Sequence, residues 1–438
     1  MMRMKRFFSL CVVFAMMYLV QTAAANPGDT STPGSASQPK KTIIFYTWED
    51  PTMVNVFEGF NKVQNEIFVD IKYLPAGDYD AKLITLLAAG VPMDLYNQKA
   101  TSNMYTQYAN GYIQPLDDLV KKHGYNLKNI AAVDKYMRID GKLVGIPYRL
   151  QTYYTFYNKK VFAAAGVPTP DTFVEKVEWT WEKFQEIAKK LSSGDGKVIG
   201  SDIYTFQSNQ IIPALQAGRQ IITDKGQIDI DNTVVYSFKM RKSLEQAKAM
   251  IPYMEHLTTK LHYSNAFYKG NVGMLITGEW FVGMLKQGQK DGLLQGYTYA
   301  DWGLTRLPNN EKEYSSFGSS QPVHIHAASK NKDEAFKYLA WLSSPDGGGK
   351  LLAQGGFLPV AVNDSIKAIF APNFNSTKDL NWYLESPKIH TPFSNKYGAR
   401  TGKLIADTYG KYSVTAMSDD QLMKELRAGL QEIIDTTD

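Results

Sequence analysis

Segments with the pattern of a strand alternate with segments with the pattern of a helix along the chain. The run Thr42–Tyr46 is continuous and apolar, as in a strand that is buried on both faces of a sheet. Asp50 and Pro51 then provide an N-cap carboxylate and a first-turn proline for a helix. Further strand patterns at 68–74 and 92–96 are separated by another helical pattern. This alternation predicts the α/β fold class, with a parallel-rich sheet and helices on both of its faces.

The only apolar run that approaches membrane length lies at the start of the chain. A basic cluster precedes Phe7–Val20, and the small residues Ala23–Ala25 follow it as a secretory cleavage site. With 14 residues this run is short for a bilayer helix. We therefore expect residues 1–25 to be a signal peptide and the chain to be exported to the periplasm or the cell surface. Residues 26–41, rich in Pro, Gly and Ser, are expected to form a flexible leader.

The composition of the exported chain excludes several classes of function. The single cysteine, Cys11, lies inside the expected signal peptide, so the exported chain has no thiol for a disulfide, a metal site or a nucleophile. Loss of that peptide also lowers the net charge from +5 to +2, which gives no basis for binding nucleic acid. The sequence has no G-x-S-x-G, HExxH or Walker motif. We therefore expect no enzymatic activity and no cofactor.

Two groups of residues keep a chemical alternative open. His324 and His326 would share one face of a strand and could bind zinc together, but the sequence supplies no third ligand nearby, so we predict no metal site. The carboxylate pairs Glu49–Asp50 and Asp117–Asp118 would suit a glycosidase if they were held about 5 to 9 Å apart. Residues adjacent in sequence usually point apart, so catalysis is the weaker hypothesis.

Aromatic side chains are abundant, with 27 Tyr, 21 Phe and 7 Trp, and Trp48 and Trp280 fall where loops should follow strands. In parallel α/β sheets, ligands bind beyond the carboxyl ends of the strands. Sugars suit such a site because their C–H faces stack on rings while their hydroxyls pair with amides and carboxylates. The alternative is that these rings fill the hydrophobic core.

Several segments, read together over roughly residues 42–434, resemble the extracellular solute-binding proteins of sugar-importing ABC transporters, the family that includes maltose-binding protein. These segments are Ile44–Asp50, Asp94–Tyr96, Tyr108–Asp117, Gly145–Tyr148, Tyr157–Lys159, Phe162–Pro168, Thr180–Phe184, Phe267–Trp280 and Gly355–Pro359. Each is weakly specific alone, and their order and spacing carry the resemblance.

The resemblance implies a two-lobed periplasmic-binding-protein fold, type II-like, with a hinge of several crossings. The crossings are expected near Leu150, Leu304 and Leu358. Lobe one would hold residues 42–149 and 305–357, and lobe two residues 150–304 and 358–438. The implied function is to capture a mono- or oligosaccharide between the lobes and to deliver it, by lobe closure, to the membrane permease of an ABC importer. A monomer is expected.

The resemblance also implies which loops carry ligand contacts. They are Trp48 and Glu49 after the first strand, Asn97 and Gln98 after the third, Gln151 and Tyr153 at the hinge, Gln207 and Asn209 in a second-lobe loop, Trp280 as a stacking platform, Ser319 and Ser320 in a polar loop, and Arg400 as a donor. Alternatives remain for some of them: Glu49 as a helix N-terminal charge, Asn97 and Gln98 as turn residues, Trp280 as a core residue and Arg400 in an ion pair.

One other ligand class and one other protein class stay open. Arg149, Arg306 and Arg400 would allow an anionic solute such as a uronate sugar or a phosphorylated polyol. A secreted glycoside hydrolase would instead use Glu49 or Glu279 in catalysis.

Overall fold

A computed structural model describes residues 40–99, 101–130, 137–385 and 388–437. The predicted signal peptide and all but the last two residues of the predicted leader lie outside these residues. Within the described ranges, no helix is both long enough and apolar enough to cross a membrane.

The strands of the described chain are β1 (Lys41–Trp48), β2 (Ile67–Leu74), β3 (Leu95–Asn97), β4 (Arg138–Ile139), β5 (Lys142–Leu143), β6 (Ile146–Asn158), β7 (Ile199–Ile203), β8 (Ile221–Ile222), β9 (Ile228–Asp229), β10 (Val272–Gly278), β11 (Trp302–Thr305), β12 (Ser315–Ile325) and β13 (Lys388–His390). The main sheet has the order β2-β1-β3-β12-β6-β10-β7, with β11 paired to β6 and β13 paired to β12. The remaining strands form two small ribbons, β4-β5 and β8-β9.

The α-helices are α1 (Val54–Glu58), α2 (Phe60–Val63), α3 (Tyr79–Ala88), α4 (Met104–Ala109), α5 (Asp117–Lys122), α7 (Lys159–Ala165), α8 (Pro170–Glu175), α9 (Trp181–Leu191), α10 (Ile212–Gln216), α11 (Asn232–Gln246), α12 (Tyr253–Thr259), α13 (Tyr263–Tyr268), α14 (Phe281–Lys290), α15 (Lys332–Leu342), α16 (Lys350–Gly355), α17 (Asp364–Phe370), α18 (Thr377–Leu384), α19 (Gly398–Val414) and α20 (Asp419–Asp435). Short helical turns are η1 (Ala76–Asp78), η2 (Thr101–Asn103), η3 (Leu127–Asn129), η4 (Gln207–Ile211), η5 (Tyr299–Asp301), η6 (Pro345–Gly349) and η7 (Ala371–Asn373).

Local sequence signals account for individual elements. Helix α9 begins after Thr180, whose side chain accepts the N–H of Lys183 at 3.2 Å, and its predicted inward residues, including Phe184 and Leu191, are buried. The helix expected from Asp50–Pro51 begins later, at Val54, because the Asp50 side chain accepts the N–H of Thr52 (3.1 Å) in a preceding turn.

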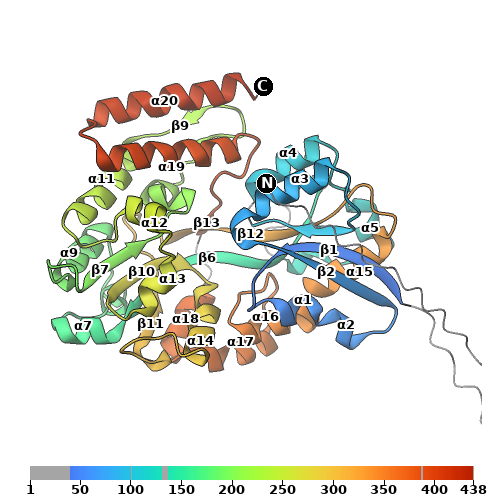
Figure 1. Ribbon diagram of the computed structural model, residues 1–438, viewed down its shortest axis with the longest axis horizontal. Coiled ribbons are helices and arrows are strands. Elements are labelled where there is room, and N and C mark those ends of the chain that lie inside the picture. Colours follow the sequence, from blue (N-terminus) through green and yellow to red (C-terminus); the bar gives the residue numbers. More distant parts are fainter. Residues whose placement is uncertain (1–39, 100, 131–136, 386–387, 438) are drawn as a thin grey trace, which may run out of the picture. The chain divides into compact units, whose positions relative to one another are not determined.

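Two long antiparallel strands, β6 and β12, connect the two ends of the main sheet (Figure 1). Residues 146–152 of β6 pair with β12, whereas residues 153–158 pair with β10 and β11. β12 in turn pairs with β13 at its start and with β3 at its end. The outer pairs β1·β2, β1·β3 and β7·β10 are parallel, as the strand–helix alternation predicts. The α/β prediction is confirmed, with antiparallel pairing added where the chain crosses out and back.

The hydrophobic core is divided between the two ends of this sheet. One cluster contains residues from 43–148 and 323–360, and two further clusters contain residues from 153–317 and 353–433. Helices α19 and α20 pack against each other and against α11 (Figure 1). This division is the arrangement expected of two lobes.

Packing around Leu307 and Phe317 bears on the crossing that is expected near Leu304. Leu307 and Phe317 pack in a cluster with β7 and α9 residues, and the Gln216 side-chain amide donates to the carbonyl groups of Pro308 and Ser315. This packing favours a crossing near Gly318 rather than near Leu304. The predicted lobe boundaries as a whole stay a prediction.

Gly318 of β12 pairs with Thr152 of β6, and it gives a test of this pairing. A Cβ added there would lie 1.9 Å from the carbonyl oxygen of Gln151, so we expect Gly318→Ala to lower the free energy of unfolding by about 2 kcal/mol or more. The matched control is Gly77→Ala, because no atom lies within 4 Å of a Cβ at that position. Urea unfolding measures both variants, and equal stabilities would contradict the close approach.

Candidate functional site

Trp280 lies at the point where the three hydrophobic clusters meet. Its ring is partly exposed and packs against residues of all three clusters. The indole N–H donates to the Tyr263 hydroxyl at 2.6 Å, which fixes the ring plane. The rings of Tyr153 and Phe206 stand edge-on to it, with centroids at 5.4 and 6.1 Å. The predicted stacking residue therefore lies in an oriented aromatic group that keeps part of its surface free.

Polar residues of β6 and β12 lie beside this aromatic group. Gln151 and Tyr153 are two residues apart in β6 and so project to the same side of the strand. Ser319 pairs with Gln151 across the strands, and its hydroxyl donates to Gln151 Oε1 at 2.8 Å. Tyr153 stacks on Phe317 of β12 with a centroid distance of 4.0 Å. Four predicted residues, Gln151, Tyr153, Trp280 and Ser319, are thus brought together by β6, β12 and the end of β10.

Phe206 and Tyr263 were not among the predicted site residues. Phe206 is 36% exposed and lies 6.0 Å from the ring of Tyr263 and 6.1 Å from that of Trp280. Its position directly before Gln207, in a loop already expected to carry contacts, is a signal that would have found it. Tyr263 has no comparable local signal, since only the fold places α13 beside Trp280.

The predicted residues after the first and third strands are mostly buried. Trp48 is 8% exposed, contacts Tyr79 edge-on at 5.3 Å, and has Lys99 Nζ 5.7 Å from its ring centroid. Asn97 is completely buried, and its amide donates to the Tyr148 hydroxyl at 3.4 Å. Gln98 is also buried and hydrogen-bonds Gln107. These side chains are therefore in the interior, beside the hydrophobic cluster of residues 43–148 and 323–360.

The remaining predicted residues are dispersed. Arg400 donates to Thr436 at 2.6 Å and to Thr437 at 3.1 Å, so its guanidinium is bound to the end of α20. Asn209 is buried and donates to the Tyr204 carbonyl, whereas Gln207 is exposed on η4. Ser320 is 3% exposed and Glu49 is exposed. The structure does not gather these residues around Trp280.

The three arginines considered for an anionic ligand are all engaged by the protein. Arg149 faces the buried Glu279, with 3.5 Å between Nε and Oε1. Arg306 makes two hydrogen bonds to the carboxylate of Glu385 and lies over Trp382. Arg400 is bound to α20 as described. A carboxylate or phosphate ligand would have to displace one of these partners.

The two histidines considered for zinc have other partners. His324 is completely buried, and its Nδ1–H donates to the Val144 carbonyl at 2.6 Å while its ring lies against Tyr96. His326 stacks on Tyr112. In the part of the chain that the structure describes, no group of three or more His, Cys, Asp or Glu side chains is placed to hold a metal ion.

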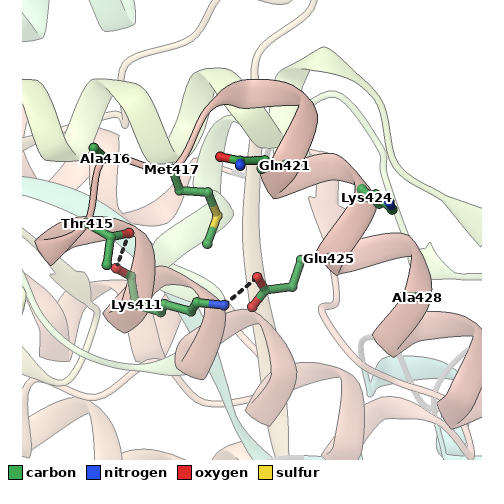
Figure 2. A pocket seen from close by; sticks show the side chains of 8 residues that line it. All are labelled: Lys411, Thr415, Ala416, Met417, Gln421, Lys424, Glu425 and Ala428. Carbon is green, nitrogen blue, oxygen red and sulfur yellow. Dashed lines mark hydrogen bonds and ion pairs between the residues drawn. The ribbon is translucent and has the colours of Figure 1, made fainter.

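An open cavity of about 580 Å³ lies at the hairpin between α19 and α20, away from these residues (Figure 2). The Lys411 ammonium and the Glu425 carboxylate pair across it at 2.6 Å, and Met417 contributes an apolar wall. None of the predicted site residues lines this cavity. It therefore gives no support to a ligand site at Trp280 and is a separate feature of the C-terminal helices.

Comparison with known families decides what kind of protein carries this site. Residues 55–379, more than half of the chain, match the family model of the bacterial extracellular solute-binding proteins. The chain belongs to this family. The predicted resemblance is thereby confirmed. Members of this family are exported binding proteins of the periplasm or the cell surface.

Individual relatives of this solute-binding protein have low sequence identity to it, but they align over most of its length. It is 24% identical over 336 residues to a putative binding protein of Brucella abortus, covering 74% of this chain and 76% of the relative. It is 23% identical over 351 residues to the galactooligosaccharide-binding protein of Bacillus subtilis, covering 76% of each. An ABC transporter solute-binding protein from Thermotoga lettingae, bound with α-D-tagatose, has a TM-score of 0.75 at 18% identity and covers 90% of this chain and all of its own. The predicted two-lobed fold is confirmed by this likeness.

His324 gives the solute-binding protein a testable pH dependence. Burial lowers the pKa of His324 from 6.5 to about 4, so the folded chain binds fewer protons than the unfolded chain between these values. This difference makes a contribution of up to about 3 kcal/mol to the free energy of unfolding. The contribution is fully present above pH 6.5 and is lost as the pH falls toward 4. We expect His324→Gln to remove this part of the pH dependence in urea unfolding. An identical pH slope in both proteins would contradict a buried neutral imidazole.

Proposed function

We propose that this solute-binding protein captures a neutral mono- or oligosaccharide at Trp280 and delivers it to the membrane permease of an ABC importer. The observation that carries the proposal is the partly exposed ring surface of Trp280 and Phe206 beside the amide of Gln151 and the hydroxyl of Ser319. Rings offer stacking surfaces for the C–H faces of a sugar, and amide and hydroxyl groups pair with its hydroxyls. These are the complementary groups that a neutral sugar requires.

The relatives support a sugar as the ligand class but differ in its size. The protein of Bacillus subtilis is named for galactooligosaccharides, whereas that of Thermotoga lettingae was crystallised with a monosaccharide. We therefore propose the class and leave the chain length open.

The two rival functions are not favoured. An anionic solute needs a free cation, and Arg149, Arg306 and Arg400 are each held by a protein partner. A glycoside hydrolase needs two carboxyl groups that reach the same bond. Glu279 is completely buried beside Arg149, and Glu49 is exposed, so neither forms a pair facing Trp280.

We propose that binding works by closure of two lobes about the crossings at Arg149–Leu150, Gly318–Gln321 and Phe357–Pro359. Lobe one would then hold residues 42–149 and 318–357, and lobe two residues 150–317 and 358–438. A sugar that contacts both lobes only in the closed form shifts the equilibrium by its difference in affinity for the two forms. Export through residues 1–25 and a monomeric state complete the proposal.

Isothermal titration calorimetry with D-tagatose, maltotriose and galactooligosaccharides tests this function. We expect at least one sugar to bind, and Phe206→Ala and Trp280→Ala each to weaken its binding by about ten-fold or more, because each removes a stacking surface. The matched control is Phe68→Ala, since Phe68 is 44% exposed on β2 and Phe206 is 36% exposed beside Trp280. Binding that is unaffected by both site variants would contradict the proposed site, and turnover of a sugar would contradict the proposed class.

A further inference from the structure

Arg149 and Glu279 form a buried ion pair at the hinge. Arg149 is 3% exposed and Glu279 is completely buried, with 3.5 Å between Nε and Oε1. Within the described residues, neither of these two atoms has a hydrogen-bond partner. The two charges therefore face each other in the interior across a gap that a full hydrogen bond would shorten.

Glu279 makes hydrogen bonds near two of the proposed crossings, and it lies directly before Trp280. Its backbone N–H donates to the Thr152 carbonyl of β6 at 2.9 Å. Its Oε2 accepts the backbone N–H of Leu358 at 3.3 Å and the Tyr383 hydroxyl at 3.4 Å. Trp280, whose ring lies in the aromatic group of the proposed site, is the next residue in the chain.

Arg149, the partner of Glu279, belongs to the proposed lobe one. It lies in β6 opposite Gln321 of β12, and its guanidinium is 4.8 Å from the ring centroid of Phe357. Its Nη1 lies 3.5 Å from the sulfur of Met53, which belongs to the hydrophobic cluster of residues 43–148 and 323–360. The ion pair thus contacts all three proposed crossings and residues of two hydrophobic clusters.

A buried ion pair adds little net stability, because desolvation of the charges offsets their attraction, but it favours the one geometry in which the charges are well paired. We propose that Arg149 and Glu279 are positioning residues, whose ion pair tightens on lobe closure and so couples the Trp280 ring to the hinge. This inference rests on the proposed function for its effect on sugar binding, and on the structure alone for its effect on Trp280.

The surroundings of Glu279 make the coupling sensitive to pH. The groups that face it are Arg149, Tyr148 and Tyr154 of β6, Tyr383 of α18 and Asp50 after β1. Burial raises the pKa of Glu279 to about 7, against the opposing attraction of Arg149. Protonation removes the charge that the tightened pair needs. Sugar affinity is therefore expected to fall as the pH is lowered through 7.

Binding measurements test the pair in the full exported chain. With the tightest-binding member of D-tagatose, maltotriose and galactooligosaccharides, we expect Glu279→Gln to weaken binding by about ten-fold and to abolish its pH dependence between 6 and 8. The matched control is Glu245→Gln, because Glu245 pairs with the buried Arg241 at 2.8 Å within α11. The control should leave affinity and its pH profile unchanged. Equal affinities and equal pH profiles for wild type and Glu279→Gln would overturn the proposal.

A second measurement needs no sugar. In protein labelled with 5-fluorotryptophan, the ¹⁹F resonance of Trp280 is assigned by its absence in Trp280→Phe. We expect this resonance to titrate with a midpoint near pH 7 in the unliganded wild type, and to lose this titration in Glu279→Gln but keep it in Glu245→Gln. If no sugar binds and the resonance titrates, the proposed function fails while the coupling stands. A Trp280 resonance that does not change from pH 6 to 8 overturns the coupling itself.

Discussion

The pairing of β6 with β12 is the constraint on which the rest of the structure depends. These strands are long enough to pair with each other in the middle and with different partners at their ends. The hydrophobic core can therefore divide into clusters on either side while the backbone hydrogen bonds stay continuous. Gly318 permits this approach, because a side chain at its position would collide with the Gln151 carbonyl. The predicted site residues Gln151, Tyr153 and Ser319 lie on these two strands, and this pairing sets their positions.

Aromatic packing then fixes the Trp280 ring at the junction of the hydrophobic clusters. Trp280 is held by its hydrogen bond to Tyr263 and by edge contacts with Tyr153 and Phe206, so little rotamer entropy remains to be lost when a ligand stacks on it. The adjacent Glu279 is buried against Arg149 and the Leu358 backbone. The proposed recognition residue and the proposed hinge residue are therefore consecutive in the chain.

Local patterns in the sequence predicted much of the fold. The Thr180 cap and the apolar spacing of α9 were sufficient to place that helix, and the order of the family segments was sufficient for the two-lobed class. Contacts between distant residues were not predictable in this way. Arg400 is bound by Thr436 and Thr437, which lie more than thirty positions further along the chain, and the Trp48 ring is covered by Tyr79 and Lys99. The packing of 307–317 against Gln216 and its neighbours, on which we base the proposed crossing near Gly318, was also not predictable from local patterns.

Closure of two lobes around a sugar is the central claim, and small-angle X-ray scattering tests it most directly. The measurement compares the exported chain, residues 26–438, without sugar and saturated with the sugar that calorimetry finds to bind most tightly. The account predicts a smaller radius of gyration in the saturated sample, because closure brings the two ends of the main sheet together. Identical scattering profiles at saturation would contradict it.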